Sequence, residues 1–221
     1  MIPERALLLA LASSALFTAA CSGSSESPPG PTPTPTTSPT STQPASPNAA
    51  VRFKGPDRIR NDLGRALSLA PNEICNELGT FSCTDTVHTV TLGGVSPYEH
   101  QIYEPLRQTV ASTPLAADRV VLAACLERAK RDFAAPEGAT VWKGVKVDGA
   151  GKLAEASTDT VKAAIDGLYA QLLSRHASDA EIAAIRGFYD KVLAGAPAKP
   201  AESWAALSCY AVGTSVEFLF Y

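Results

Sequence analysis

The sequence predicts a mainly α-helical fold: a small helical bundle, stapled by disulfides, with one possible short β-hairpin. The strongest indication is a succession of three amphipathic patterns over residues 158–221, because helices joined by short loops pack as a bundle. The second indication is the cysteine count, since four cysteines follow residue 50 and an even number is typical of a disulfide framework. We therefore expect a single helical domain over residues 51–221.

The first predicted helix spans residues 57–69 and has Asp57 available as its N-cap. Pro71 can open a second, short helix that Gly79 closes. Residues 84–92 are rich in β-branched side chains and are interpreted as extended, with a short helix as the alternative. The apolar positions of the two helices are Ile59, Leu63, Ala66, Leu67, Ile74, Cys75 and Leu78.

A longer helix is predicted to begin at Thr113-Pro114 and to end before Pro136. The loop before it, residues 96–107, carries two prolines and two tyrosines and should be ordered with at most a helical turn. Residues 139–153 alternate around an Asp-Gly turn signal and are the possible hairpin. The buried face of the long helix would hold Ala117, Val121, Ala124 and Cys125, and Trp142 would cover the helices.

The last three helices have the clearest pattern. The first spans residues 158–175, the second follows a capping box of Ser178 and Glu181 and ends near Gly195, and the third begins at about Ser203. Their apolar positions are Val161, Ile165, Leu168, Tyr169, Leu172, Leu173, Ile182, Ile185, Phe188, Tyr189, Val192, Trp204, Leu207, Tyr210, Ala211, Phe218 and Leu219.

The N-terminal residues 1–20 are predicted to be a signal peptide. Arg5 precedes an apolar run of small residues that is too short to span a membrane, and the run ends at Cys21. The residues before Cys21 resemble a bacterial lipobox, although Thr18 stands where Leu is usual. The resemblance implies cleavage, lipidation of Cys21 and stable anchoring in a membrane. The alternatives are an ordinary signal peptide cut after Ala20, or a short hydrophobic anchor that ends in a buried cysteine.

Residues 21–50 follow as a lipidated cysteine and a Ser/Thr/Pro-rich tether. The segment has no aliphatic side chain larger than alanine, so it cannot bury enough apolar surface to offset the entropy of ordering. We expect the chain to be anchored by lipid in a bacterial cell envelope, and Ser22 after the cysteine favours the outer membrane.

The remaining cysteines are expected to form disulfides in this oxidising compartment. Four cysteines permit three connectivities. We favour Cys75 with Cys83, which closes a short loop, and Cys125 with Cys209, which would join two helices distant in sequence. The alternative for the second pair is that both are small buried apolar residues.

The charge distribution argues against nucleic-acid binding. The formal net charge is −3, and removing Arg5, Glu4 and Glu26 from the totals of 19 basic and 22 acidic residues leaves 18 and 20 from residue 51 onward. Such a balance gives no basic surface for nucleic acid or for anionic lipid. The expected contacts are the membrane, through the lipid, and a protein of the envelope.

No complete catalytic motif occurs in the sequence. A Cys-x-x-Cys-His haem motif, a Gly-x-Ser-x-Gly elbow and a His-Glu-x-x-His zinc motif are all missing, so we assign no catalytic residue, metal ligand or cofactor. Residues 83–104 are the region where a metal or hydrolase site would lie, because Cys83, Glu99 and Glu104 are close to two histidines. A possible binding loop in this region comprises His88, Tyr98, His100 and Tyr103.

The C-terminal helices share a set of apolar and capping residues with a known family. The set is Leu168, Tyr169, Leu172, Leu173, Arg175, Glu181, Ile182, residues 204–207, Cys209, Ser215 and residues 217–220. It resembles the C-terminal helical part of cell-surface proteins that are abundant in planctomycetes and myxobacteria. Those proteins often carry, or are encoded near, c-type cytochrome domains, and their helical regions have no assigned activity. The resemblance implies a place in a cell-surface or electron-transfer assembly and transfers no catalytic residue.

These observations favour a lipid-anchored accessory or interaction module without catalytic activity. The alternative is an envelope hydrolase or metal-binding protein that uses residues 83–104. Metal analysis of the purified protein, together with substitution of His88 and His100, distinguishes the two.

Overall fold

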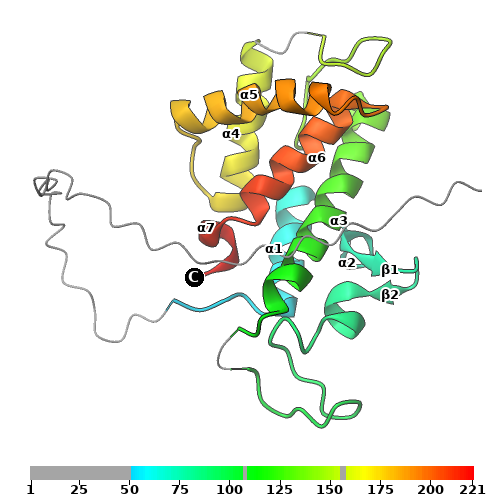
Figure 1. Ribbon diagram of the computed structural model, residues 1–221, viewed down its shortest axis with the longest axis vertical. Coiled ribbons are helices and arrows are strands. Elements are labelled where there is room, and N and C mark those ends of the chain that lie inside the picture. Colours follow the sequence, from blue (N-terminus) through cyan, green and yellow to red (C-terminus); the bar gives the residue numbers. More distant parts are fainter. Residues whose placement is uncertain (1–50, 107–108, 155–157) are drawn as a thin grey trace, which may run out of the picture. The chain divides into compact units, whose positions relative to one another are not determined.

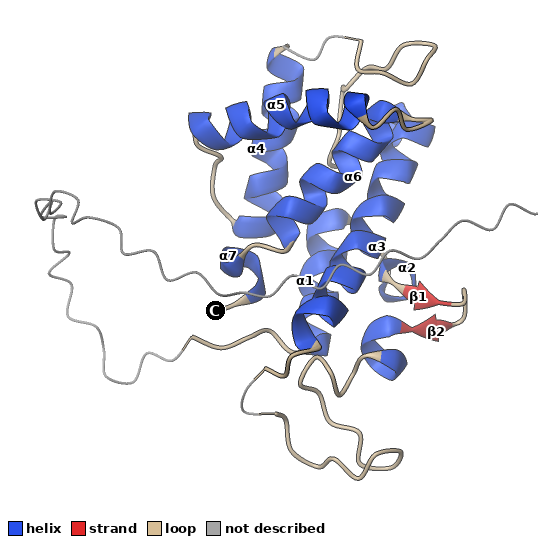
Figure 2. Cartoon of the chain, in the orientation of Figure 1, coloured by secondary structure: helices blue, strands red, loops and turns tan. Residues whose placement is uncertain are grey.

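Helices dominate the structure, as the sequence predicts (Figure 1, Figure 2). The computed structural model describes residues 51–106, 109–154 and 158–221, which belong to one unit of the chain. In chain order its elements are α1 (Pro56–Leu67), α2 (Pro71–Ile74), β1 (Asn76–Glu77), β2 (Phe81–Ser82), a π-helical turn (Cys83–Val87), α3 (Thr113–Ala134), a 3-10 turn (Pro136–Gly138), α4 (Asp159–Leu173), α5 (Asp179–Ala194), α6 (Pro200–Gly213) and α7 (Val216–Leu219).

The core is organised around α3 and α6, which pack side by side (Figure 1). Helices α1 and α2 contact α3, and α5 contacts α6, while α4 contacts α1, α5 and α6. Burial of this shared apolar surface is the main favourable contribution to folding. The largest fully buried side chains are Trp204, Phe218, Ile59, Leu63, Leu67, Ile74, Leu92, Ile165, Leu168, Val120 and Val121.

Helix α1 begins one residue earlier than predicted. Pro56 occupies the first helical position and Gly55 is the N-cap, so Asp57 lies in the first turn and is not the cap. Proline suits this position because its missing N–H would have no partner there. The helix ends at Leu67, two residues before the predicted end, and Ser68 follows as the C-cap in the left-handed conformation; the predicted apolar face is buried.

The predicted second helix is shorter than expected and gives way to a hairpin that the sequence analysis did not predict. Helix α2 ends at Ile74, and β1 pairs antiparallel with β2. The turn between them has positive φ at Leu78 and Gly79, and the Thr80 N–H donates to the Glu77 carbonyl. Positive φ at both central residues matches the right-handed twist of a two-stranded ribbon. Gly79 therefore closes a turn, not a helix.

Residues 84–92 are not extended, so the preferred interpretation of this segment is wrong. The segment begins in the π-helical turn and continues as hydrogen-bonded turns to Gly93, which confirms helical structure in its first part. The Ser82 hydroxyl caps the turn by accepting from the Asp85 N–H. The β-branched side chains that favoured a strand are tolerated because tertiary contacts override local propensity.

Helix α3 begins one residue earlier than predicted, with Ser112 as its N-cap, and it ends before Pro136 as predicted; its four expected core residues are buried. Thr113 does not act as a side-chain cap, however. Its buried hydroxyl donates to the Thr91 carbonyl at 2.7 Å and accepts from the Val110 N–H. This bond fixes the start of α3 against the preceding turns.

The hairpin predicted over residues 139–153 does not form as two strands. A single antiparallel bridge joins Val147 and Leu153 around a turn in which Asp148 accepts from the N–H groups of Ala150 and Lys152. Trp142 is buried as predicted, with its ring centroid 5.0 Å from that of Trp204.

The C-terminal helices follow the prediction except at two boundaries. The capping box of Ser178 and Glu181 is present at the start of α5. Helix α6 begins at Pro200, three residues before the predicted start, and the predicted third helix breaks after Gly213 so that Ser215 caps a separate α7. The chain then pairs with residues 52–54 near the start of the described region.

Candidate functional site

Both predicted disulfides are present in the structure. Cys75 bonds Cys83 across the base of the β1–β2 hairpin, and Cys125 of α3 bonds Cys209 of α6. The Cα atoms of the pairs are 5.4 and 5.6 Å apart. The bond between α3 and α6 closes a loop of 84 residues and therefore removes much entropy from the unfolded chain.

Three of the predicted binding-loop residues lie on an exposed loop that bulges from the domain. Backbone hydrogen bonds between Ser96 and Ile102 close its base. The side chains of Tyr98 and Tyr103 are 98% and 73% exposed, so neither is a core residue. His100 Nδ1 lies 3.0 Å from the Ser96 hydroxyl, which orients the ring across the loop.

His88, the fourth predicted residue, lies apart from this loop, between the hairpin and α3. Its Nε2 atom is 3.5 Å from Glu77 Oε1, and the same carboxylate is held by the Arg119 guanidinium of α3 through Nη2 at 2.6 Å. The hydrogen bond from Arg119, assisted by His88, lowers the pKa of Glu77. A hollow of about 360 Å³ adjoins the cluster and is lined by His88, Thr91, Ser112, Leu115, Ala116 and Arg119. The arrangement ties the hairpin to α3.

The geometry assembles no metal centre in the part of the chain that the structure describes. No group of three or more His, Cys, Asp or Glu side chains there is close enough to hold an ion. Cys83 is consumed by its disulfide and cannot be a thiolate ligand.

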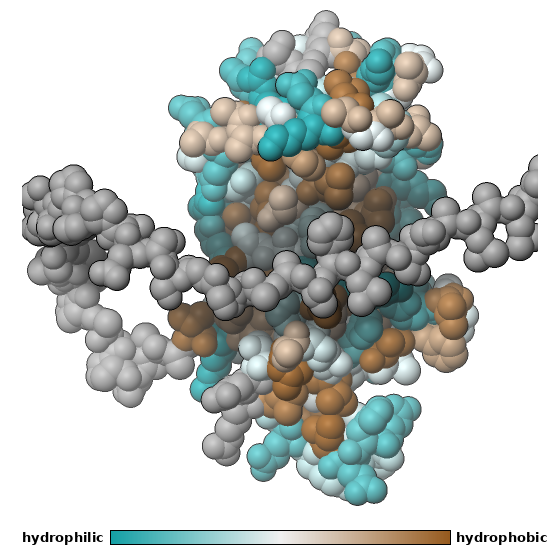
Figure 3. Space-filling model, in the orientation of Figure 1, coloured by the Kyte–Doolittle hydropathy of each residue, from teal (hydrophilic) through white to brown (hydrophobic). Residues whose placement is uncertain are grey.

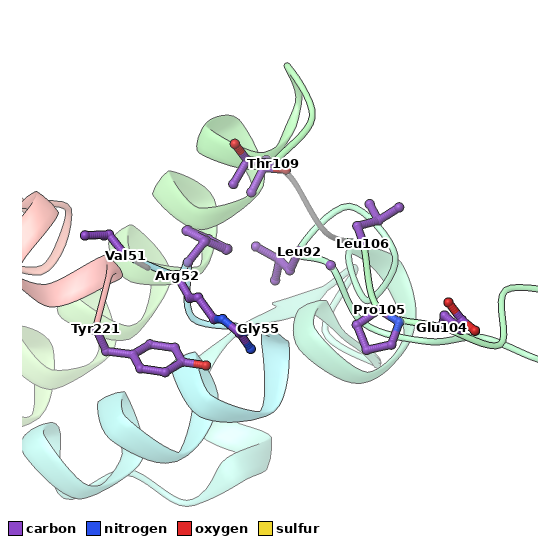
Figure 4. A pocket seen from close by; sticks show the side chains of 12 residues that line it. Val51, Arg52, Gly55, Leu92, Glu104, Pro105, Leu106, Thr109 and Tyr221 are labelled. Atoms are coloured by element: carbon purple, nitrogen blue, oxygen red, sulfur yellow. The ribbon is translucent and has the colours of Figure 1, made fainter. Parts of the chain in front are cut away.

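A larger groove lies where the first described residues, the loop before α3 and the C-terminal residue meet (Figure 4). Its volume is about 1150 Å³. The groove is lined by Val51, Arg52, Phe53, Gly55, Leu92, Gly93, Glu104, Pro105, Leu106, Thr109, Thr113 and Tyr221. Of the residues singled out in the sequence for the 83–104 region, Glu104 lines the groove, and none of the four predicted binding-loop residues does.

The groove has a mixed lining of apolar and polar groups and carries opposite charges on its two sides. Leu92 is fully buried behind it, and Leu106 is partly exposed on the wall opposite Val51 (Figure 4). Arg52 lies on the side of Val51, whereas Glu104 lies beside Pro105 and Leu106 (Figure 4). Such a lining suits a ligand that carries both apolar and charged groups.

Many of the exposed large apolar side chains come from one stretch of the chain. Figure 3 shows apolar residues at the surface beside the β1–β2 hairpin and near the start of α3. Among the described residues, nine of the fifteen large apolar side chains that are exposed come from residues 78–115. They are Leu78, Phe81, Val87, Val95, Tyr98, Tyr103, Leu106, Val110 and Leu115. Where such side chains form a contiguous patch, the patch is a candidate contact surface.

The groove could not be predicted from the sequence because its walls are distant in the chain. Arg52, Leu106 and Tyr221 carry no motif, and long-range pairing of residues 52–54 with residues 219–221 brings these segments together. A partial signal was the apolar pair Val51 and Phe53 before the first helix, since neither residue is needed for a helical face.

The predicted signal peptide, the lipidation site Cys21 and the tether lie outside the described residues. Within the described ranges, no helix has the length and apolar character needed to cross a bilayer. No family model, curated protein or solved structure matches the chain.

Proposed function

We propose that the chain is a lipid-anchored accessory module of a bacterial envelope that binds another envelope protein and has no catalytic activity. Lipidation of Cys21 would hold the protein at the membrane, and the Ser/Thr/Pro-rich residues 22–50 would separate the domain from the surface. The resemblance of the C-terminal helices favours a cell-surface assembly, including one that transfers electrons, as the setting.

The observation that carries the interaction role is the groove together with the exposed apolar side chains of residues 78–115. Large contiguous exposed apolar surfaces are uncommon on monomeric proteins and often mark a site that a partner covers. The groove offers a mixed lining of apolar and charged side chains, which is typical of protein interfaces. No cluster of general acid, base and nucleophile accompanies it among the residues that line it.

Photo-crosslinking in the native envelope tests this function. A benzophenone amino acid is placed at Leu106 in the groove of the full chain, and as a control at Leu126, an exposed leucine on α3. Leu126 is 13 residues beyond the start of α3, which corresponds to roughly 20 Å along the helix. We expect one protein to be captured from Leu106 and not from Leu126, and the capture to be lost when Arg52→Glu is added.

Two results would contradict the proposal. The first is equal capture from both positions, which indicates contact by chance. The second is hydrolase activity or stoichiometric bound metal that disappears in His88→Ala and His100→Ala, which would favour the alternative of an enzyme or metal-binding protein.

A further inference from the structure

The groove is bordered by an unpaired strand edge. Residues 52–54 pair antiparallel with residues 219–221: the Arg52 N–H donates to the Tyr221 carbonyl at 3.0 Å, the Tyr221 N–H returns a bond of the same length, and the Lys54 N–H donates to the Leu219 carbonyl at 2.8 Å. In an antiparallel pair, alternate residues direct their N–H and C=O groups away from the partner strand. Phe53 is the alternate residue here, and its backbone groups have no hydrogen-bond partner among the described residues.

Side-chain contacts hold this two-stranded ribbon in place. The rings of Phe53 and Phe220 meet edge to face with centroids 5.5 Å apart. Lys54 forms an ion pair with Asp62 at 2.8 Å and lies 4.2 Å above the Phe218 ring. The strand is therefore ordered before any ligand arrives, which reduces the entropy cost of binding.

The groove beside the strand has the form that an added strand requires. Its near wall carries the apolar side chains of Val51 and Phe53, and its far wall is formed by Glu104, Pro105, Leu106 and Thr109 (Figure 4). An extended peptide in this space could bond the Phe53 N–H and C=O through its backbone and direct alternate side chains toward these walls. The exposed edge would then be covered, as strand edges in native proteins generally are.

We propose that this edge binds an extended segment of the partner protein as a third strand, with an acidic side chain against Arg52 and a basic side chain against Glu104. The inference rests on the proposed interaction function and specifies its partner: a strand with apolar residues at alternate positions and charged residues of opposite sign.

Charge and backbone chemistry argue against two other occupants of the edge, the chain's own residues 22–50 and a second copy of the chain. The chain's own residues 22–50 contain many prolines, which cannot donate to a strand, and Glu26 is their only charged residue. A second copy paired antiparallel about Phe53 would place Arg52 opposite Lys54 of the other strand. Like charges directly across a ribbon are unfavourable.

Amide hydrogen exchange on the full chain in detergent micelles tests the proposal directly. The probe is a capped ten-residue peptide of alternating valine and threonine, with glutamate near one end and lysine near the other, made in both orders. We expect the Phe53 amide to exchange quickly in the free protein and to slow severalfold with the peptide order that fits. The Arg52 and Lys54 amides, already bonded, should change little and serve as internal controls.

Peptide binding to charge-altered variants of the protein supplies the second readout. Arg52→Glu should weaken binding of the glutamate–lysine peptide severalfold and favour a peptide with lysine near both ends. Leu106→Asp should abolish binding of the original peptide, whereas the matched Leu126→Asp on α3 should leave it unchanged.

Three results would overturn the inference. If the Phe53 amide already exchanges slowly without peptide, another occupant covers the edge. That occupant is a second copy if the protection falls on dilution, and the chain's own N-terminal region if it does not. Peptide effects confined to residues away from the groove would exclude the edge as the site. Crosslinks to a native partner that map only to other surfaces would refute the third strand while leaving the interaction function intact.

Discussion

Asp132 shows how single buried charges position the loops of this domain. Its side chain has no exposed surface, forms an ion pair with Arg128 at 2.7 Å, and accepts from the N–H groups of Thr140, Val141 and Trp142. Arg128 in turn donates to the Leu67 carbonyl at the end of α1. One carboxylate therefore links α3, α1 and the segment that carries Trp142.

Asp132→Ala should destabilise the domain by about 3–5 kcal/mol, because it leaves the Arg128 charge buried and unpaired and removes acceptors from three backbone N–H groups. The free energy of unfolding from urea titrations measures the effect. Glu137→Ala, an exposed carboxylate on the following 3-10 turn, should change stability by no more than about 0.5 kcal/mol. Equal effects of the two substitutions would contradict the assigned role of Asp132.

Glu181 predicts a specific dependence of stability on pH. Hydrogen bonds from Arg175, and then from the Ser178 backbone and hydroxyl, lower its pKa from 4.5 to about 2. Because the folded-state pKa is lowered, its stabilising contribution is fully present above pH 4.5 and is lost as the pH falls toward 2. Arg175 also binds Glu217 of α7 and lowers the pKa of that carboxyl as well.

Glu181→Gln should therefore lower the melting temperature at pH 7 and make little difference near pH 2. Thermal unfolding of both proteins across this range measures the gap. Glu137→Gln is the exposed control and should remain close to the wild type at both pH values. A gap that persists unchanged at pH 2 would show that the carboxylate charge of Glu181 does not contribute.

At the scale of elements, the close crossing of α3 and α6 depends on one glycine. A Cβ atom added at Gly213 would lie 2.7 Å from Val121 Cγ1, which is closer than van der Waals contact allows. The absence of a side chain at Gly213 lets the C-terminal end of α6 approach α3 closely. The Cys125–Cys209 disulfide joins the same two helices one turn earlier in α6.

Gly213→Ala should destabilise the domain by about 1–3 kcal/mol, because the added methyl group overpacks the crossing. The second substitution Val121→Ala should restore part of the loss by removing the clashing atom. Gly187→Ala in α5, where a Cβ meets nothing within 4 Å, should be neutral or stabilise by up to about 1 kcal/mol. Chemical denaturation of the four proteins tests the account, and a Val121 substitution that gives no relief would refute it.

The elements that could be predicted from sequence are those with local signals. The capping box at α5, the Thr113-Pro114 start of α3 and the apolar stripe of α4 each rest on neighbouring residues, and the structure has all three. The hairpins could not be predicted in the same way. The Asp148-Gly149 signal yields only a bridged turn, while the real β1–β2 hairpin is fixed by the Cys75–Cys83 bond and the Arg119–Glu77 pair.

Long-range contacts explain why the burial of Arg128 and Asp132 could not be predicted from local patterns. Val121, Ala124, Cys125, Arg128 and Asp132 share one face of α3 at helical spacing, yet the buried face was predicted to end at Cys125. A charged residue on an apolar stripe is normally assigned to solvent, because burying it without a partner is costly. Besides their mutual ion pair, Arg128 and Asp132 bond backbone groups of segments that the sequence does not reveal as neighbours.

At the scale of the whole molecule, the fold brings the first and last described residues to the candidate site. Residues 51–54 and Tyr221 meet at the groove, so the first described residues form part of the proposed binding edge. A module anchored in this way would present the groove within reach of other proteins in the same envelope. Tethering raises the local concentration of such partners, so a weak binding site suffices.

Metabolic labelling with a palmitate analogue tests the central claim, the lipid anchor, most directly. The full chain and its Cys21→Ala variant are expressed in the same bacterial host and separated into membrane and soluble fractions. The wild type should carry the label and sediment with membranes, as should a Cys125→Ala/Cys209→Ala control that removes other cysteines. Cys21→Ala should lose both properties, and equal labelling of Cys21→Ala and the wild type would contradict the account.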